Sequence, residues 1–122
     1  MKPITAHAHG VLDYVMVVLF LAAPTLFGLA GIAATISYVL ALIHLLLTAI
    51  TAFPLGAFRI VPFKVHGALE LLVGVLLVAL PWLLGFSGET ASRNFYVTVG
   101  LVILVVALLT HFQGADVARA DG

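Results

Sequence analysis

Apolar residues run through most of this chain in stretches of about 20, and glycine, proline and polar residues break the run at three places. The four stretches lie roughly at 10–30, 33–53, 62–84 and 95–112. A helix needs about 20 mostly apolar residues to cross the hydrocarbon layer of a bilayer. The pattern therefore predicts an all-α fold, a four-helix transmembrane bundle. Because the spans use most of the chain, residues 1–122 are interpreted as a single integral membrane domain.

The breaks have the composition of short connections. Gly28-Leu29-Ala30-Gly31 separates the first two stretches, and segments rich in glycine, proline and polar residues at 54–62 and 85–94 separate the others. The first stretch is interpreted as a retained span rather than a cleaved signal peptide. Its apolar run from Val11 is long for a signal peptide, and Asp13 lies near its start.

Composition agrees with a lipid environment. The chain is 64% hydrophobic and 8% charged, whereas a soluble domain is about 45–50% apolar and about a quarter charged. These values exclude an ordinary soluble enzyme and a disordered chain, and the absence of cysteine excludes a disulfide-stapled secreted module. The formal net charge of +0 provides no basic surface for nucleic acid. The expected partners are the lipid bilayer and a homo-oligomer or larger membrane complex.

The basic residues predict an orientation. With four spans, the N-terminus, the 54–64 connection and the C-terminus lie on one side of the membrane. Four of the five basic residues belong to that side, and Arg93 belongs to the other. By the positive-inside rule, both termini are expected to be cytoplasmic.

An internal repeat is the most specific feature of the sequence. His9-Gly10-Val11-Leu12-Asp13 recurs 57 residues later as His66-Gly67-Ala68-Leu69-Glu70. Each repeat contains two spans, repeat 1 at about 9–53 and repeat 2 at about 66–112. Both copies therefore have the same orientation, and a pseudo-twofold axis is expected along the membrane normal.

Proline and glycine recur in the same register, because Pro24 and Gly28 become Pro81 and Gly85. Proline is expected to kink the last turns of each first helix, and glycine to end it. The fold is thus predicted to be two tandem two-helix repeats. The structural motif comprises Gly10, Pro24, Gly28, Gly67, Pro81, Trp82 and Gly85.

The run Pro81-Trp82-Leu83-Leu84-Gly85-Phe86, within this doubled two-helix unit, resembles the SPW repeat family of small bacterial membrane proteins. The resemblance extends from His9 to about Phe112, with Leu80 standing where the family's name has serine. It implies a multi-pass protein of the bacterial inner (cytoplasmic) membrane. It carries no established activity over to this chain.

Ionisable side chains inside the spans are the candidates for function, because such groups are costly in lipid unless they have partners. They lie in the cytoplasmic half or near the midplane: His9, Asp13, His44, His66, Glu70 and His111. His9 with Asp13, and His66 with Glu70, are spaced four residues apart and share a helix face. A carboxylate there can accept the imidazole N–H and leave the other nitrogen for a metal or a proton.

His44 has no counterpart in the repeat, because the offset of 57 places Leu101 there. It belongs to a stripe of small and polar residues with Ser37, Thr48 and Thr51, which is expected to pack inward against other helices. A polar cluster around His44, His66 and Glu70 is therefore the first site to test, and these three residues are the metal-ligand candidates.

A structural or accessory role, with a partner bound in the membrane, is the favoured function, because the repeated residues mostly shape helices. One alternative is a transition metal or haem b held by the histidine and carboxylate side chains. Another is proton or ion movement along Asp13, Glu70 and His44, although the far half of the bundle offers almost no ionisable residue. Catalysis is disfavoured, because the sequence has neither a Ser-His-Asp pattern nor a phosphate-binding glycine loop.

Overall fold

The computed structural model describes residues 2–110 and 112, which form four long helices and two very short strands. The helices are α1 (Ala6–Phe27), α2 (Gly31–Ile50), α3 (Phe63–Leu83) and α4 (Thr90–Leu109). Each helix is long and apolar enough to cross a membrane. The predicted all-α, four-helix transmembrane bundle is confirmed.

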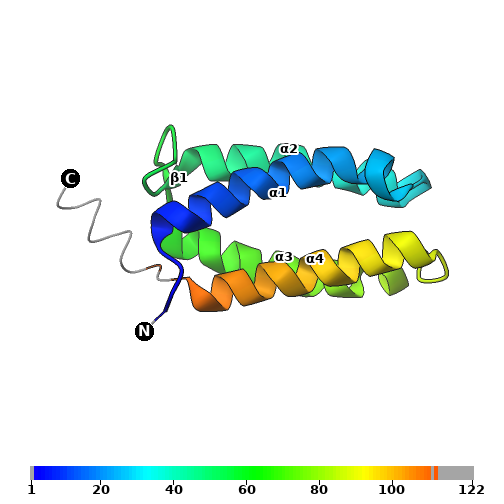
Figure 1. Cartoon of the computed structure of the whole chain (residues 1–122). Helices are drawn as coiled ribbons and strands as arrows, with labels where there is room; N and C mark the ends of the chain where they lie inside the picture. Colours follow the sequence, from blue (N-terminus) through cyan, green and yellow to red (C-terminus); the bar gives the residue numbers. More distant parts are fainter. Residues whose placement is uncertain (1, 111, 113–122) are drawn as a thin grey trace.

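The helices pair as two hairpins, α1 with α2 and α3 with α4, which lie side by side (Figure 1). Strands β1 (Thr51–Ala52) and β2 (Val61–Pro62) pair in parallel within the connection between the hairpins. A second parallel bridge joins Ile4, just before α1, to Thr110, just after α4. Backbone pairing therefore joins the hairpins at the end of the bundle that carries the N-terminus (Figure 1).

The second hairpin repeats the first, but its two helices are offset from their counterparts by different numbers of residues. α3 begins 57 residues after α1, at Phe63 against Ala6, whereas α4 begins 59 residues after α2, at Thr90 against Gly31. The connection between α3 and α4 is longer, so the second helices are shifted by two residues. By this register His44 corresponds to Ile103, and the correspondence with Leu101 taken from the first offset is wrong.

The helix ends explain the boundaries. The Thr5 hydroxyl accepts a hydrogen bond from Ala8 N at 3.1 Å and caps α1. The helix continues through Pro24 to Phe27 and is followed by its C-cap, Gly28, with φ 67°. In α3, Pro81 likewise lies inside the helix, and Gly85 with φ 78° follows the C-cap. Glycine adopts this left-handed conformation without the steric cost that a side chain adds.

Helix α4 begins at Thr90 rather than near residue 95, as the apolar pattern predicted. Its first turns contain Ser92, Arg93 and Asn94, and a helix can include polar residues where it reaches the membrane interface. The hydrophobic pattern alone therefore places this boundary too late.

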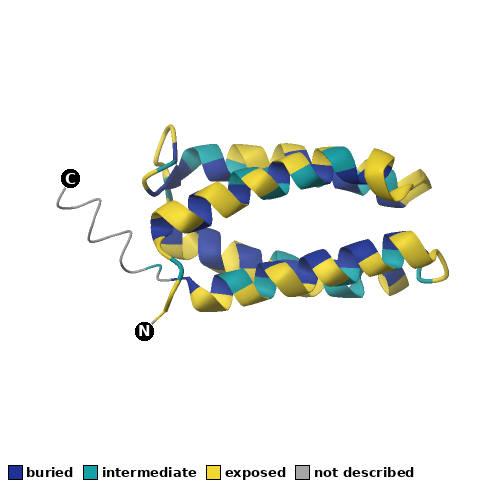
Figure 2. Cartoon of the chain, in the orientation of Figure 1, coloured by how far each residue is buried: buried dark blue, intermediate teal, exposed yellow. Residues whose placement is uncertain are grey.

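Burial follows the helix faces that meet inside the bundle (Figure 2). A cluster that includes Phe20, Leu77 and Tyr96 fills the core, while outward leucine and valine side chains such as Val18 are exposed to lipid. α3 and α4 approach each other closely at two glycines, where a Cβ on Gly100 would lie 2.8 Å from the carbonyl oxygen of Gly74. Small residues at such a crossing are typical of membrane helices.

Candidate metal centre

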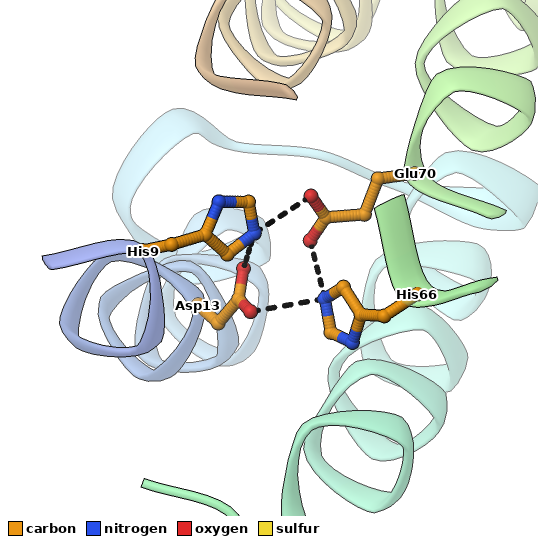
Figure 3. A group of neighbouring side chains, drawn as sticks. All are labelled: His9, Asp13, His66 and Glu70. Carbon is orange, nitrogen blue, oxygen red and sulfur yellow. Dashed lines mark hydrogen bonds and ion pairs between the residues drawn. The ribbon is translucent and has the colours of Figure 1, made fainter. Parts of the chain in front are cut away.

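Two histidine–carboxylate pairs meet between the hairpins, near the end of the bundle where the strands lie. His9 and Asp13 come from α1, and His66 and Glu70 come from α3 (Figure 3). Each histidine is the fourth residue of its helix, and its carboxylate follows one turn later on the same face. All four residues are buried, with exposed fractions of 0–5%.

The four side chains form a ring in which imidazoles and carboxylates alternate (Figure 3). His9 Nε2 lies 3.3 Å from Asp13 Oδ1 and 2.9 Å from Glu70 Oε2. His66 Nε2 lies 3.0 Å from Asp13 Oδ2 and 2.9 Å from Glu70 Oε1. Each carboxylate therefore bridges the two imidazoles, and each hairpin contributes half of the ring.

A threonine beyond each histidine determines where that imidazole carries its proton. His66 Nδ1 lies 2.7 Å from Thr51 Oγ1, and this hydroxyl donates to the Leu47 carbonyl oxygen at 2.6 Å. Because the hydroxyl proton is used in that bond, Thr51 accepts the Nδ1–H of the histidine. The Nε2 atom is left facing the centre of the ring.

The other half repeats this arrangement. His9 Nδ1 lies 2.7 Å from Thr110 Oγ1, and the Thr110 hydroxyl donates to the Val106 carbonyl oxygen at 2.6 Å. Thr51 and Thr110 are the C-caps of α2 and α4, so they correspond through the second offset. Outer hydrogen bonds of this kind orient histidines that bind metals.

The ring requires positive charge at its centre. Two nitrogen lone pairs and two carboxylates at these separations repel one another unless protons or a cation lie between them. His66 Nε2 has the geometry to hydrogen bond with Glu70 Oε1. His9 Nε2, although close to both carboxylates, is not aligned for a hydrogen bond with any described residue. A buried nitrogen without such a bond is costly, and a ligand that it binds offsets the cost.

The ring dimensions are close to those of a metal site. Tetrahedral zinc binds nitrogen and oxygen at about 2.0–2.2 Å, which separates the donor atoms by about 3.3–3.6 Å. The four nitrogen–oxygen separations in the ring are 2.9–3.3 Å, so the side chains would move apart by a few tenths of an ångström to hold the ion. The ligand atoms of the four residues all lie within 4.8 Å of one another. Imidazole and carboxylate donors together suit divalent first-row metals such as Zn²⁺.

Haem does not fit between these histidines. The His9 and His66 ring centroids are 5.6 Å apart with planes at 80°, and both carboxylates occupy the space between them (Figure 3). A porphyrin with two axial histidines would have to displace Asp13 and Glu70. The haem alternative therefore requires a different arrangement of the site.

Phenylalanine side chains cover the ring on the side of the strands. Phe53 and Phe63 stack with centroids 5.3 Å apart, and Phe63 contacts the His9 ring edge-on, also at 5.3 Å. Phe112 packs on Phe63 at 4.6 Å. The glycine after each histidine makes room for this cover, because a Cβ on Gly67 would lie 2.6 Å from the Phe112 ring. The His-Gly pair thus places a polar ring under an apolar cover.

The structure brings five of the six candidate residues together and places His44 at the edge of the group. His44 Nε2 lies 3.4 Å from Asp13 Oδ1 and 4.0 Å from Glu70 Oε1. Of the three metal-ligand candidates named from sequence, His66 and Glu70 belong to the ring, and His9 and Asp13 complete it instead of His44. His111 lies outside the described residues, and Trp82 is 59% exposed, away from the site.

The sequence did not identify the two threonines that hydrogen bond with the histidines. Thr51 appeared only as part of the stripe around His44, and Thr110 was not considered. A signal was nevertheless present, because Thr51 and Phe53 recur 59 residues later as Thr110 and Phe112. A search restricted to the offset of 57 cannot find that pair.

No continuous ionisable route leads from the ring to the opposite end in the part of the chain that the structure describes. Among these residues, the buried polar side chains of the far half are Ser37, Ser92 and Tyr96. Ser37 donates to the Phe20 carbonyl oxygen and Tyr96 to the Ala33 carbonyl oxygen, each at 2.6 Å. These hydroxyls hold helices together and offer no charged relay site.

Comparison with known proteins places the chain in a family. A family model described as the SPW repeat domain matches residues 7–110, which includes all four residues of the ring. No curated protein and no solved structure match the chain.

Proposed function

The chain belongs to the SPW repeat family, and we propose that it is a membrane protein that holds a divalent transition-metal ion, Zn²⁺ in particular, between its two hairpins. The metal is bound by His9, Asp13, His66 and Glu70. The orientation of the imidazoles carries this proposal, because both threonines direct a histidine Nε2 toward the same pair of carboxylates.

Charge supports a divalent ion. Two buried carboxylates contribute two negative charges, which one divalent ion balances when both imidazoles are neutral. The alternative is a metal-free ring in which protons on the imidazoles balance the carboxylates. The two forms differ in composition, so metal analysis separates them.

The proposed role of the metal is structural. Four protein donors close the coordination sphere, as in structural zinc sites, and each hairpin supplies two of them. The metal then joins the two halves of the bundle, which agrees with the structural or accessory role that the repeated helix-shaping residues favour. The setting we propose is the bacterial inner membrane, with both termini cytoplasmic and with a homo-oligomer or larger membrane complex around the bundle.

The test is the metal content of the full chain, purified in a mild detergent without chelators from cells supplied with zinc. We expect about one metal ion per chain by elemental mass spectrometry. The variants Glu70→Gln and His66→Gln are expected to lose most of it, because each replaces a strong metal ligand by a neutral amide, whose oxygen binds metal weakly, at similar side-chain volume. His7→Gln and Glu89→Gln serve as controls, since both residues are exposed.

A second measurement separates a lost ligand from a lost fold. Addition of Co²⁺ to chelator-treated protein is expected to produce the visible absorption bands of a four-coordinate site, and Glu70→Gln is expected to lack them while keeping its helical circular dichroism. Wild-type protein that is metal-free and does not take up Co²⁺ or Zn²⁺ would overturn the proposal. The ring would then be a protonated joint between the hairpins.

A further inference from the structure

Two cavities border the ring on opposite sides of the contact between the hairpins. One, of about 190 Å³, lies between α1 and α4, and the other, of about 40 Å³, lies between α2 and α3. The pseudo-twofold relates them, because Leu12 and Val106 in the first correspond to Leu69 and Leu47 in the second. Equivalent positions in the two halves of the bundle therefore differ: side chains leave a large cavity between α1 and α4 and nearly fill the one between α2 and α3.

The larger cavity has apolar walls and a polar inner end. Leu12, Val15 and Val102 are among its wall residues, and they are 40–58% exposed on the lipid side of the bundle. Asp13, His44 and Glu70 form its inner end. A molecule that enters from the bilayer therefore meets apolar side chains first and polar groups last.

Two atoms at that inner end lack hydrogen bonds. Asp13 Oδ2 and His44 Nε2 are buried and have no hydrogen-bond partner among the described residues. Asp13 Oδ2 lies 3.0 Å from His66 Nε2, but without the alignment of a hydrogen bond. His44 Nε2 lies 3.4 Å from the other oxygen of the same carboxylate, Asp13 Oδ1. The Asp13 side chain is only 5% exposed, so water does not satisfy it freely. A hydroxyl group suits this pair, because it donates to a carboxylate and accepts from an imidazole N–H.

The volume determines the size of the occupant. An apolar cavity of about 150 Å³ is known to hold benzene. A cavity of about 190 Å³ therefore accepts one six-membered ring with small substituents. Such a ring is as apolar as the walls, and its hydroxyl group satisfies the polar end.

We propose that the cavity between α1 and α4 binds a lipid-soluble phenolic ring, whose hydroxyl group lies between Asp13 and His44. Free phenols and the hydroquinone head groups of membrane quinols share this chemistry. The cavity shares Asp13 and Glu70 with the proposed metal site, but His44 and the apolar walls lie outside the ring of four donors, so binding of the phenolic ring is measured separately from binding of a metal.

The test measures binding of 2,6-dimethylphenol to the full chain in lipid nanodiscs by saturation-transfer NMR, with m-xylene as the matched ligand that lacks the hydroxyl. We expect saturable binding of the phenol and at least about tenfold weaker binding of m-xylene, from the loss of the hydroxyl hydrogen bonds. His44→Ile, which copies Ile103 of the other half, is expected to weaken phenol binding about tenfold and to leave m-xylene unchanged.

The pseudo-twofold provides matched variants that fill one cavity or the other. Val106→Phe is expected to abolish saturable phenol binding, whereas Leu47→Phe, at the corresponding position of the smaller cavity, is expected to retain it. Val102→Phe and Ile43→Phe repeat the comparison at the mouth, in case the first variant does not fold. Phenol binding that survives in a folded Val106→Phe or Val102→Phe variant, or equal binding of m-xylene, would overturn the proposal.

Two further arms complete the design. Displacement of dimethylphenol by a short-chain prenylated hydroquinone assigns the cavity to quinols, whereas its failure assigns the cavity to free phenols. Binding is measured on chelator-treated and on Zn²⁺-treated protein. Saturable binding by the chelator-treated protein supports the cavity even if the chain takes up no metal, so the two proposals fail independently.

Discussion

At the residue scale, the chemistry of the site depends on hydroxyl groups that look ordinary in the sequence. Thr51 and Thr110 each donate to a carbonyl oxygen in the preceding turn and accept from a histidine. Serine and threonine often bond to that carbonyl in a helix, where the bond has little consequence. Here the bond fixes the histidine tautomer and directs the imidazole Nε2 toward the centre of the ring, so each threonine orients its histidine.

Replacement of this hydroxyl tests its role. Thr51→Val leaves the Nδ1–H of His66 buried without an acceptor, which is expected to lower the free energy of unfolding by about 1–3 kcal/mol. If the ring binds zinc, the affinity is expected to fall about 10–100-fold, as for other outer hydrogen bonds. Thermal unfolding and a zinc titration measure the two effects.

The control is Thr35→Val, because the Thr35 hydroxyl also donates to a preceding carbonyl oxygen, at 3.3 Å from Gly31 O, but is exposed. It is expected to change neither quantity appreciably. Equal effects of the two substitutions would show that Thr51 has no special part in the site.

At the element scale, the repeated His-Gly pair allows the first helices to pack under the aromatic cover. Gly10 follows His9 on α1, and a Cβ there would lie 2.8 Å from Leu55 Cδ1 and would also contact the Phe53 ring. Phe53 is 1% exposed and stacked on Phe63, so it cannot move aside. Glycine is unfavourable inside a helix, but at this position it allows the segment after β1 to pack closely against α1.

Gly10→Ala tests whether close packing against the aromatic cover outweighs the higher helix propensity of alanine. Alanine in a helix interior is favoured over glycine by about 0.5–1 kcal/mol, whereas overpacking a well-packed interior costs about 1–3 kcal/mol. We expect net destabilisation of about 1–2 kcal/mol in the free energy of unfolding. Gly88→Ala is the control, because a Cβ there meets nothing within 4 Å. Unchanged or increased stability of Gly10→Ala would show that the cover is loosely packed.

At the scale of the whole molecule, the hairpins are joined differently at the two ends. The end with the strands has backbone pairing, the polar ring and the aromatic cover. Toward the other end, Tyr96 on α4 donates to the Ala33 carbonyl oxygen of α2 at 2.6 Å and joins the hairpins within the apolar core. Polar links at both ends thus fix how the two halves are placed.

Tyr96→Phe tests this second link. The substitution keeps the ring but leaves the Ala33 carbonyl oxygen without its donor. We expect the free energy of unfolding to fall by about 0.6 kcal/mol, the average for hydrogen bonds between membrane helices, and by no more than about 1.7 kcal/mol. Unfolding by a denaturing detergent measures the change. Tyr38→Phe, at a residue that is 46% exposed, is expected to have no effect. A loss of similar size there would assign the effect to tyrosine in general.

The sequence by itself determined the architecture and half of the site. Apolar runs of about 20 residues determine four spans because lipid permits only backbones that satisfy their own hydrogen bonds. The repeat identified His9 with Asp13 and His66 with Glu70, since a spacing of four residues places each pair on one helix face.

Only the tertiary structure decided that the two pairs form one ring. The spacing of residues within α1 does not determine which face of that helix packs against α3. The contacts from Thr51 to His66 and from Thr110 to His9 also join different hairpins. The change of offset from 57 to 59 hid this symmetry. His44 is a second example. Its depth within α2 follows from the sequence, but its place at the inner end of the cavity between α1 and α4 depends on how the four helices pack.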